Sequence, residues 1–247
     1  MIVDAHVHVD EVPALGWSMP VAATLAEMDR TGIDRSVIMT ITDAPAVNAD
    51  ALEMLATETR RYDRRLLAYA RVHPWYGDRA EALLEYALGD LGFVGLKLHP
   101  VTNITHPGDE SCLRLIRVAA RHGAPTLFHC GDEPLTTPLE IEQAAIACPE
   151  ATIVLGHMGA YAHHADAIAV AERNPNVVLE TSGVPYPGVV AEALARVGAE
   201  RIIWGSDGPG CRPELERRKL DLVGLSEDQR RLVMGENQRH LMDRVEP

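Results

Sequence analysis

The chain has 247 residues, 47% of them hydrophobic and 24% charged, so it is long enough to bury a full core. Its formal net charge of −13 gives a surface that repels phosphate backbones, and we therefore expect no nucleic-acid partner. The cysteines Cys112, Cys130, Cys148 and Cys211 include no C-x-x-C pair, which excludes a zinc knuckle and a thioredoxin-type motif. Neither a secretory signal nor a membrane-span pattern is present, so we expect a cytoplasmic protein without a membrane partner.

Short β-branched apolar runs alternate with longer amphipathic stretches along the chain. The runs expected as strands are Ile2–Val9, Ile33–Thr42, Arg65–Val72, Phe93–His99, Pro125–His129, Thr152–Gly156, Val177–Thr181 and Arg201–Gly205. Helical periodicity follows at Val21–Thr31, Ala49–Tyr62, Asp78–Leu88, Glu110–His122, Ala162–Asn174 and Gly188–Val197. Strict alternation of strand and helix implies right-handed crossovers and a parallel sheet.

Eight such units predict an α/β fold, a single (β/α)8 TIM barrel, better than a doubly wound sheet, which usually has fewer strands. No G-x-G-x-x-G motif opens the first helix, which removes the main support for a dinucleotide-binding fold. The segment Ser226–Val245 predicts one extra C-terminal helix after the last unit. Because no linker or internal repeat interrupts the chain, we expect residues 1–247 to form one domain.

His6 and His8 stand at the end of the first apolar run, in the sequence D-A-H-V-H. The strand period of two sends both imidazoles to the same face, about 6–7 Å apart. Two imidazoles at this spacing form half of a first-row metal site.

Polar side chains recur where later strands are expected to end, and active-site groups of a parallel barrel lie at that end. His6, His8, His129 and Asp207 would supply four metal ligands, and His157 a fifth or a group that acts on bound water. Asp207 is also placed to accept a proton from water that the ion has acidified. Lys97 shares its parity with His99 and is expected to point into the barrel.

The chain resembles the amidohydrolase superfamily, in the amidohydrolase-related branch that includes aminocarboxymuconate-semialdehyde decarboxylase-like proteins. The matching pieces are D-A-H-V-H at 4–8, G-L-K-L-H-P at 95–100, F-H-C-G at 128–131, G-H-M-G at 156–159, W-G-S-D-G-P at 204–209 and G-E-N-Q-R-H-L-M at 235–242. They follow the order of the family and span almost the whole chain. The resemblance implies the fold and a metal centre, and it leaves the reaction open.

Carried over by position, the resemblance implies metal ligation by His6, His8, His129 and Asp207. It implies that His157 is a second-metal ligand or a catalytic base. A lysine at the position of Lys97 is carboxylated and bridges two metals in binuclear members, whereas mononuclear decarboxylases of the branch usually lack it. Lys97 is therefore expected either to bridge a second ion or to bind an anionic group of the substrate.

The first functional hypothesis is a metal-dependent hydrolase in which activated water attacks a small carboxylate, amide, ester or lactone. Asp207, His157 and Lys97 are its candidate catalytic residues. Strand-end position makes His99 and Arg71 candidates for substrate binding, and Trp17 is expected in an apolar lid.

The alternative is a non-oxidative, metal-dependent decarboxylase of the same branch. A TatD-like nuclease shares the pattern H-x-H-x-D, but such proteins carry a glutamate where this chain has Lys97. The expected cofactor is one or two divalent ions, zinc first, with manganese or another first-row ion as alternatives. The expected partner is a small-molecule substrate, and a homodimer stays open.

Overall fold

Each of the eight apolar runs forms a parallel strand in the computed structural model, which describes residues 1–12, 16–41, 49–62 and 65–245. The eight strands are shorter than the sequence suggested and lie in the predicted places. Their bounds are β1 Val3–His8, β4 Arg35–Met39, β5 Leu66–Ala68, β6 Leu96–Leu98, β7 Thr126–His129, β8 Ile153–Gly156, β9 Val177–Glu180 and β10 Ile202–Ile203.

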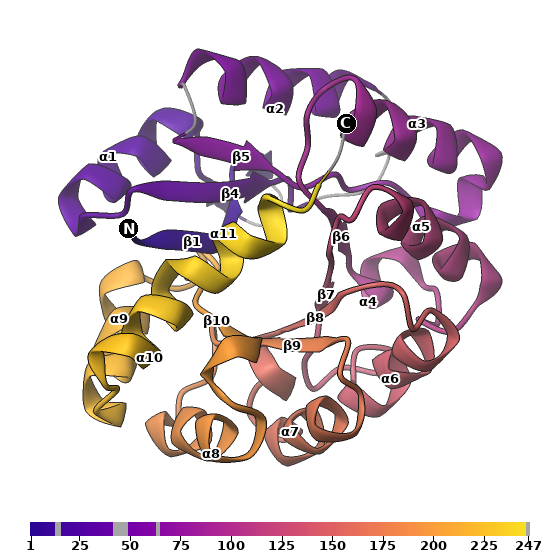
Figure 1. The fold of residues 1–247 in the computed structure, drawn as a ribbon. Helices are drawn as coiled ribbons and strands as arrows, with labels where there is room; N and C mark the ends of the chain where they lie inside the picture. Colours follow the sequence, from indigo (N-terminus) through magenta and orange to yellow (C-terminus); the bar gives the residue numbers. More distant parts are fainter. Residues whose placement is uncertain (13–15, 42–48, 63–64, 246–247) are drawn as a thin grey trace.

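Helices follow the strands and form an outer ring around them, as Figure 1 shows. Their bounds are α1 Val21–Thr31, α2 Ala49–Arg61, α3 Asp78–Gly89, α4 Pro100–Asn103, α5 Glu110–Arg121, α6 Pro138–Ala147, α7 His164–Arg173, α8 Pro187–Val197 and α9 Pro213–Val223. Short helical turns follow at η2 Pro74–Tyr76, η3 His157–Gly159 and η4 Ala199–Arg201. Helices α4, α6 and α9 lie outside the helical stretches predicted above. A capping box of Thr137 and Glu140 begins α6, with Pro138 in its first turn.

The strands close into a barrel in sequence order. One run of paired strands is β1-β4-β5 and the other is β10-β9-β8-β7-β6. Bridges between Ala70 and Leu96 and between Val7 and Gly208 join the two runs at both seams. The expected (β/α)8 architecture is therefore confirmed.

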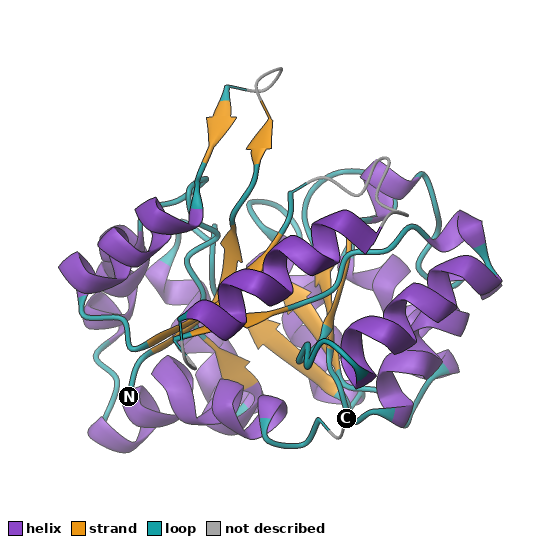
Figure 2. Cartoon of the chain, turned by 90° about the horizontal axis from the view of Figure 1, so that it is seen from above, coloured by secondary structure: helices purple, strands orange, loops and turns teal. Residues whose placement is uncertain are grey.

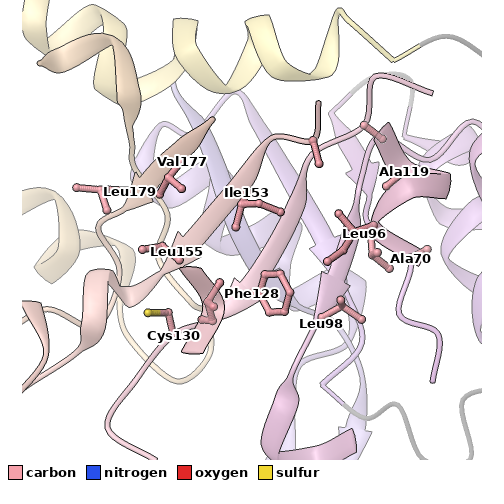
Figure 3. Packing of buried hydrophobic residues seen from close by; sticks show 14 of the residues in the cluster. Ala70, Leu96, Leu98, Ala119, Phe128, Cys130, Ile153, Leu155, Val177 and Leu179 are labelled. Atoms are coloured by element: carbon pink, nitrogen blue, oxygen red, sulfur yellow. The ribbon is translucent and has the colours of Figure 1, made fainter. Parts of the chain in front are cut away.

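Two buried layers hold this architecture together. The larger lies between strands and helices and includes Leu96, Phe128, Leu155 and Leu179, which Figure 3 labels. The smaller fills the barrel interior with side chains from alternate strand positions, among them Val37, Leu127, Val154, Val178 and Ile203. Aliphatic side chains dominate both layers, since only 4% of the residues are aromatic.

The C-terminal segment forms a helix at the opposite end of the barrel from the strand C-termini. It comprises α10 Glu227–Arg231, the π-helical turn η5 Leu232–Glu236 and α11 Asn237–Met242. Leu241 and Met242 of α11 pack into the interior layer, so the helix closes that end of the barrel (Figure 1). The expected extra helix is present. None of the described helices is long and apolar enough to cross a membrane.

A short antiparallel hairpin, β2 Glu11–Val12 and β3 Trp17–Ser18, follows β1. Figure 2 shows it projecting from the barrel. Trp17 was expected to form a lid, but its side chain lies outside the part of the chain that the structure describes. The lid stays a prediction.

An irregularity in β1 sets the direction of the two histidines. The register between β1 and β4 shifts between Asp4 and Val7. Val3 and Ala5 pack in the barrel interior, while Val7 packs in the outer layer. Strict alternation would put all three on one face. The bulge therefore turns the second half of the strand, so that His6 and His8 face the inside of the barrel mouth.

A buried ion pair ties α9 to the segment after β9. Lys219 Nζ lies 2.5 Å from Glu216 Oε2 and donates hydrogen bonds to the carbonyls of Thr181 (2.8 Å) and Val184 (2.7 Å). Burial raises the pKa of Glu216 to about 7 from an ordinary value of 4.5, because desolvation outweighs the charge of Lys219.

We expect Glu216 to make the protein less stable as the pH rises from about 4.5 to 7. In this window the folded carboxyl keeps a proton that the unfolded chain has released, so the free energy of unfolding falls, by at most about 3 kcal/mol. Glu216→Gln should remove this component. Urea unfolding of both proteins at several pH values measures it. Identical pH dependence in wild type and variant would contradict the assignment.

Candidate metal centre

Polar side chains converge at the end of the barrel where the strands have their C-termini, which we call the mouth. β1 carries His6 and His8, β6 carries Lys97 and leads to His99, β7 ends at His129, and Asp207 follows β10. His157 begins η3 directly after β8. The structure therefore places these predicted site residues at the C-terminal ends of their strands, where parallel barrels build their sites.

Three of them form a compact group of donor atoms. His6 Nε2 lies 3.4 Å and His8 Nε2 3.3 Å from Asp207 Oδ1. His6 is fully buried and His8 nearly so. Two imidazoles and one carboxylate in this arrangement are a typical donor set for a first-row divalent ion.

The ring orientation of both His6 and His8 is fixed by contacts at Nδ1, the nitrogen that faces away from Asp207. His8 Nδ1 donates to the carbonyl of Thr40 at 3.1 Å, and His6 Nδ1 faces Glu180 Oε2 at 3.4 Å. Acceptors at Nδ1 hold the proton there and leave the Nε2 lone pair directed at Asp207. The residues present therefore fit a metal ion.

The protonation states of the donor group are those required for binding a metal ion. Burial lowers the pKa of His6 well below its usual value, and the charge of Lys97 lowers it further. Burial would raise the pKa of Asp207, but the neighbouring rings of His6, His157 and His8 outweigh it and hold that pKa well below normal. Neutral imidazoles and an ionised carboxylate are the forms that bind metals.

The backbone at the mouth is unusual at two of these positions. Asp207 has φ 55° and His157 has φ 68°, both in the left-handed region. The Asp207 N–H donates to the His6 carbonyl at 2.8 Å, which holds the strained residue against β1. Such strain persists where surrounding contacts require it, and it clusters at functional sites.

Glu180, which the sequence analysis did not single out, connects the two sides of the mouth. It is fully buried at the end of β9 and accepts hydrogen bonds from the His157 N–H (3.2 Å) and from the Ser182 hydroxyl (2.7 Å) and N–H (2.6 Å). Together with His6 and His157 it forms a second group of possible metal donors. A glutamate inside the apolar run Val177–Thr181 was the signal in the sequence.

His157 is tied to the same network. Its Nδ1 lies 2.9 Å from Ser182 Oγ and 3.2 Å from the Ser182 carbonyl. Because the Ser182 hydroxyl donates its proton to Glu180, its oxygen accepts a hydrogen bond from His157 Nδ1–H. The Nε2 lone pair of His157 therefore takes no part in this network. Burial lowers the pKa of His157 to about 4, so the ring is neutral at neutral pH and can accept a proton.

Lys97 points into the barrel, as its parity predicted. It is 1% exposed, and its Nζ donates to His6 Nε2 at 2.9 Å. The lysine therefore contacts the same lone pair that a metal ion would use, and an ion must displace it from that atom.

His129 lies apart from the compact donor group. Among the described residues it belongs to neither group of possible metal donors. Its ring stacks on His99 with centroids 4.0 Å apart, and its Nε2 is 3.4 Å from Glu133 Oε2. Its centroid is 4.8 Å from that of His157, so it borders the centre. Metal ligation by His129 stays a prediction.

Two predicted substrate-binding residues line the mouth. Arg71 is buried and donates to the carbonyls of Thr40 (3.0 Å) and Ile41 and to Thr102 Oγ1 (3.3 Å). It shares the Thr40 carbonyl with His8. His99 Nδ1 is buried without a hydrogen-bond partner among the described residues. Burial, together with His129 and Lys97, lowers the pKa of His99.

Two other residues have local roles away from the centre. His73 accepts a hydrogen bond from the Trp75 N–H and caps the turn η2. Cys130 is buried in the outer layer, opposite in direction to His129, and burial raises its thiol pKa. A buried thiol with a raised pKa is a poor nucleophile, so Cys130 has a packing role.

Comparison with known protein families identifies the family of this chain. The family model described as amidohydrolase matches residues 3–242. The chain belongs to the amidohydrolase family. No curated protein shows significant sequence similarity to this chain.

Several solved structures share the fold of this chain at low identity. 2,6-Dihydroxybenzoate decarboxylase complexed with 2,6-dihydroxybenzoate matches with TM-score 0.80 and 17% identity, over 98% of this chain and 99% of the other. 5-Carboxyvanillate decarboxylase from Sphingomonas paucimobilis matches with TM-score 0.78 and 17% identity, over 99% of both chains. A dihydroxybenzoic acid decarboxylase from Polaromonas sp. JS666 with bound manganese and 2-nitroresorcinol matches with TM-score 0.76 and 16% identity, over 98% of this chain and 96% of the other.

Proposed function

We propose that this member of the amidohydrolase family is a metal-dependent, non-oxidative decarboxylase of a small aromatic or unsaturated carboxylate. The observation that carries the proposal is the convergence at one mouth of the donor group His6, His8 and Asp207 with two buried cationic side chains, Lys97 and Arg71. The structural neighbours named above act on hydroxylated benzoates, and they favour decarboxylation over the hydrolysis that the sequence analysis put first.

The metal would be held by His6, His8 and Asp207, with His129 as a further ligand. When bound, it supplies positive charge that holds a carboxylate or phenolate oxygen and stabilises negative charge developing next to it. Manganese, present in a neighbour, and zinc both suit this donor set.

The chain's own residues account for the remaining requirements. In the reaction the bond between the carboxyl carbon and its neighbour breaks, carbon dioxide leaves with the carboxyl oxygens, and the carbon that keeps the electron pair takes a proton. Lys97 and Arg71 orient the anionic substrate. His157 takes up a proton from solvent water on Nε2 and passes it to that carbon, while Ser182 and Glu180 fix its tautomer and stabilise its protonated form.

Hydrolysis is the second candidate, and the position of Lys97 favours it. Its Nζ contacts His6 Nε2, where a modified lysine would bridge two ions. A two-ion centre with His157 and Glu180 on the second ion would suit attack by water on an ester, amide or lactone.

A substrate panel separates the two reactions. We expect the protein, supplied with manganese or zinc, to release carbon dioxide from at least one hydroxybenzoate or unsaturated acid, and to leave esters, amides and lactones intact. A chelator should abolish the release and added metal restore it. Hydrolysis of the esters or lactones without carbon dioxide release would overturn the decarboxylase proposal.

Lys97→Ala tests the number of ions. If the enzyme is a decarboxylase with one ion, elemental analysis of the variant should still find one ion per chain. The KM for the carboxylate substrate should rise at least about tenfold, because the variant lacks a buried cation that binds it. Lys219→Ala, which removes a buried lysine outside the mouth, is the control. A fall from two ions to one would instead support the hydrolase with a bridging lysine.

We further propose that residues 1–247 act as one barrel domain and that the substrate is the only partner the site requires. The acidic net charge of −13 makes a nucleic-acid substrate the least suitable of the alternatives.

A further inference from the structure

A cavity of about 210 Å³ lies outside the barrel, at the seam where β10 meets β1. Helix α1, strand β4 and the start of α9 complete its walls. Ser206 and Gly208 line it, and they flank Asp207 on the chain. Because Val7 also lines it and faces away from the barrel interior, the cavity lies behind the strands that carry the metal-ligand candidates.

Most of the lining is apolar, from Val7, Met19, Met28 and Ile33. Besides Ser206, whose hydroxyl oxygen accepts a hydrogen bond from the Gly208 N–H at 3.1 Å, two hydroxyl side chains line it, Thr24 on α1 and Ser36 on β4. They are 2% and 1% exposed, and neither hydroxyl oxygen has a hydrogen-bond partner among the described residues. Buried hydroxyls without partners are rare in folded proteins and point to a missing ligand or water.

Two of the charged lining residues, Asp4 and Glu27, already have partners, and the third, Arg212, is exposed at the surface. Asp4 accepts hydrogen bonds from the N–H groups of Ser206 (2.8 Å) and His6 (3.2 Å). Glu27 is paired with Arg30. A charged ligand would therefore find no buried counter-charge inside, whereas an uncharged one with a hydroxyl can bond Thr24 and Ser36.

We propose that this cavity binds a small uncharged molecule with an apolar body and a hydroxyl group, held by the Thr24 and Ser36 hydroxyls. A cavity of about 150 Å³ lined by aliphatic groups accommodates benzene, so a phenol-sized molecule fits. The site is separate from the metal centre and does not depend on which reaction that centre catalyses.

The test uses phenol as the probe, with toluene and benzoate as matched molecules that lack the hydroxyl or carry a charge. Methyl NMR of the metal-loaded protein should show saturable shifts of Met19 and Met28 with phenol at millimolar concentration or below. Toluene should bind more weakly, and benzoate should leave both methyl groups unshifted.

Thr24→Val keeps the shape of the side chain and removes its hydroxyl. It should weaken phenol binding about three- to tenfold and leave toluene binding unchanged. Thr31→Val on the same helix is the control, since the Thr31 hydroxyl donates to the Glu27 carbonyl at 2.7 Å and does not line the cavity. Ser36→Ala provides a second variant with the same expected loss. Absence of saturable shifts in wild type, which would leave water as the occupant, or equal phenol affinity in wild type and both variants would overturn the proposal.

Discussion

Replacing Asp207 with asparagine is expected to lower kcat/KM by at least about a thousandfold and to weaken metal binding by more than about a hundredfold. The Asp207 oxygen nearest both histidines is the anionic member of the donor group, and its pKa well below normal keeps it ionised. Asparagine preserves the size of the side chain and removes the charge. Elemental analysis after gel filtration and steady-state kinetics on the substrate found in the panel measure both effects.

Asp132→Asn is the matched control. Asp132 lies in the segment after β7 and, among the described residues, accepts hydrogen bonds from the backbone N–H groups of Tyr161 (3.3 Å) and Ala162 (2.9 Å). It should retain metal and activity. If Asp207→Asn keeps both as well, Asp207 is not a ligand.

The second large effect is expected from Glu180→Gln. Both oxygens of Glu180 accept from donors: Ser182 N–H on Oε1, and the Ser182 hydroxyl, the His157 N–H and His6 Nδ1 around Oε2. A glutamine amide must point its NH2 group at donors in either orientation. When that group faces His6, the ring proton shifts to Nε2 and blocks the lone pair needed for the metal.

We therefore expect Glu180→Gln to weaken metal binding about 10- to 100-fold and to lower kcat by a comparable factor. Thermal unfolding and metal titration of the folded variant separate this effect from loss of the fold. Ser182→Ala is a useful partner, because it breaks the link to His157 without touching His6, and should lower kcat while leaving metal affinity near wild type. Wild-type metal affinity in a folded Glu180→Gln would exclude the positioning role.

Much of the fold was predictable because the strand runs are apolar and the intervening helices amphipathic. All eight strands lie where the sequence indicated, and the C-terminal helix closes the barrel as an extra element. The β2–β3 hairpin was not predicted, since strands of two residues leave no periodicity to detect. The bulge in β1 was also invisible, because it depends on register with β4 and not on the local sequence.

The site was predictable to the extent that strand parity determines direction. His6, His8, Lys97 and Asp207 meet as the alternation and strand-end rules implied. Glu180 was not predicted as a site residue because a single glutamate in an apolar strand forms no recognisable motif. Its importance comes from contacts with residues 174 and 23 positions away, His6 and His157. The stacking of His129 on His99 likewise depends on two separate strands coming side by side.

Anomalous diffraction from crystals grown with manganese tests the central claim most directly. The account predicts a metal peak within about 2.0–2.3 Å of His6 Nε2, His8 Nε2 and a carboxylate oxygen of Asp207, with the Lys97 ammonium displaced from His6. A well-ordered mouth with no peak at these three atoms, or a peak held by other residues, would contradict it.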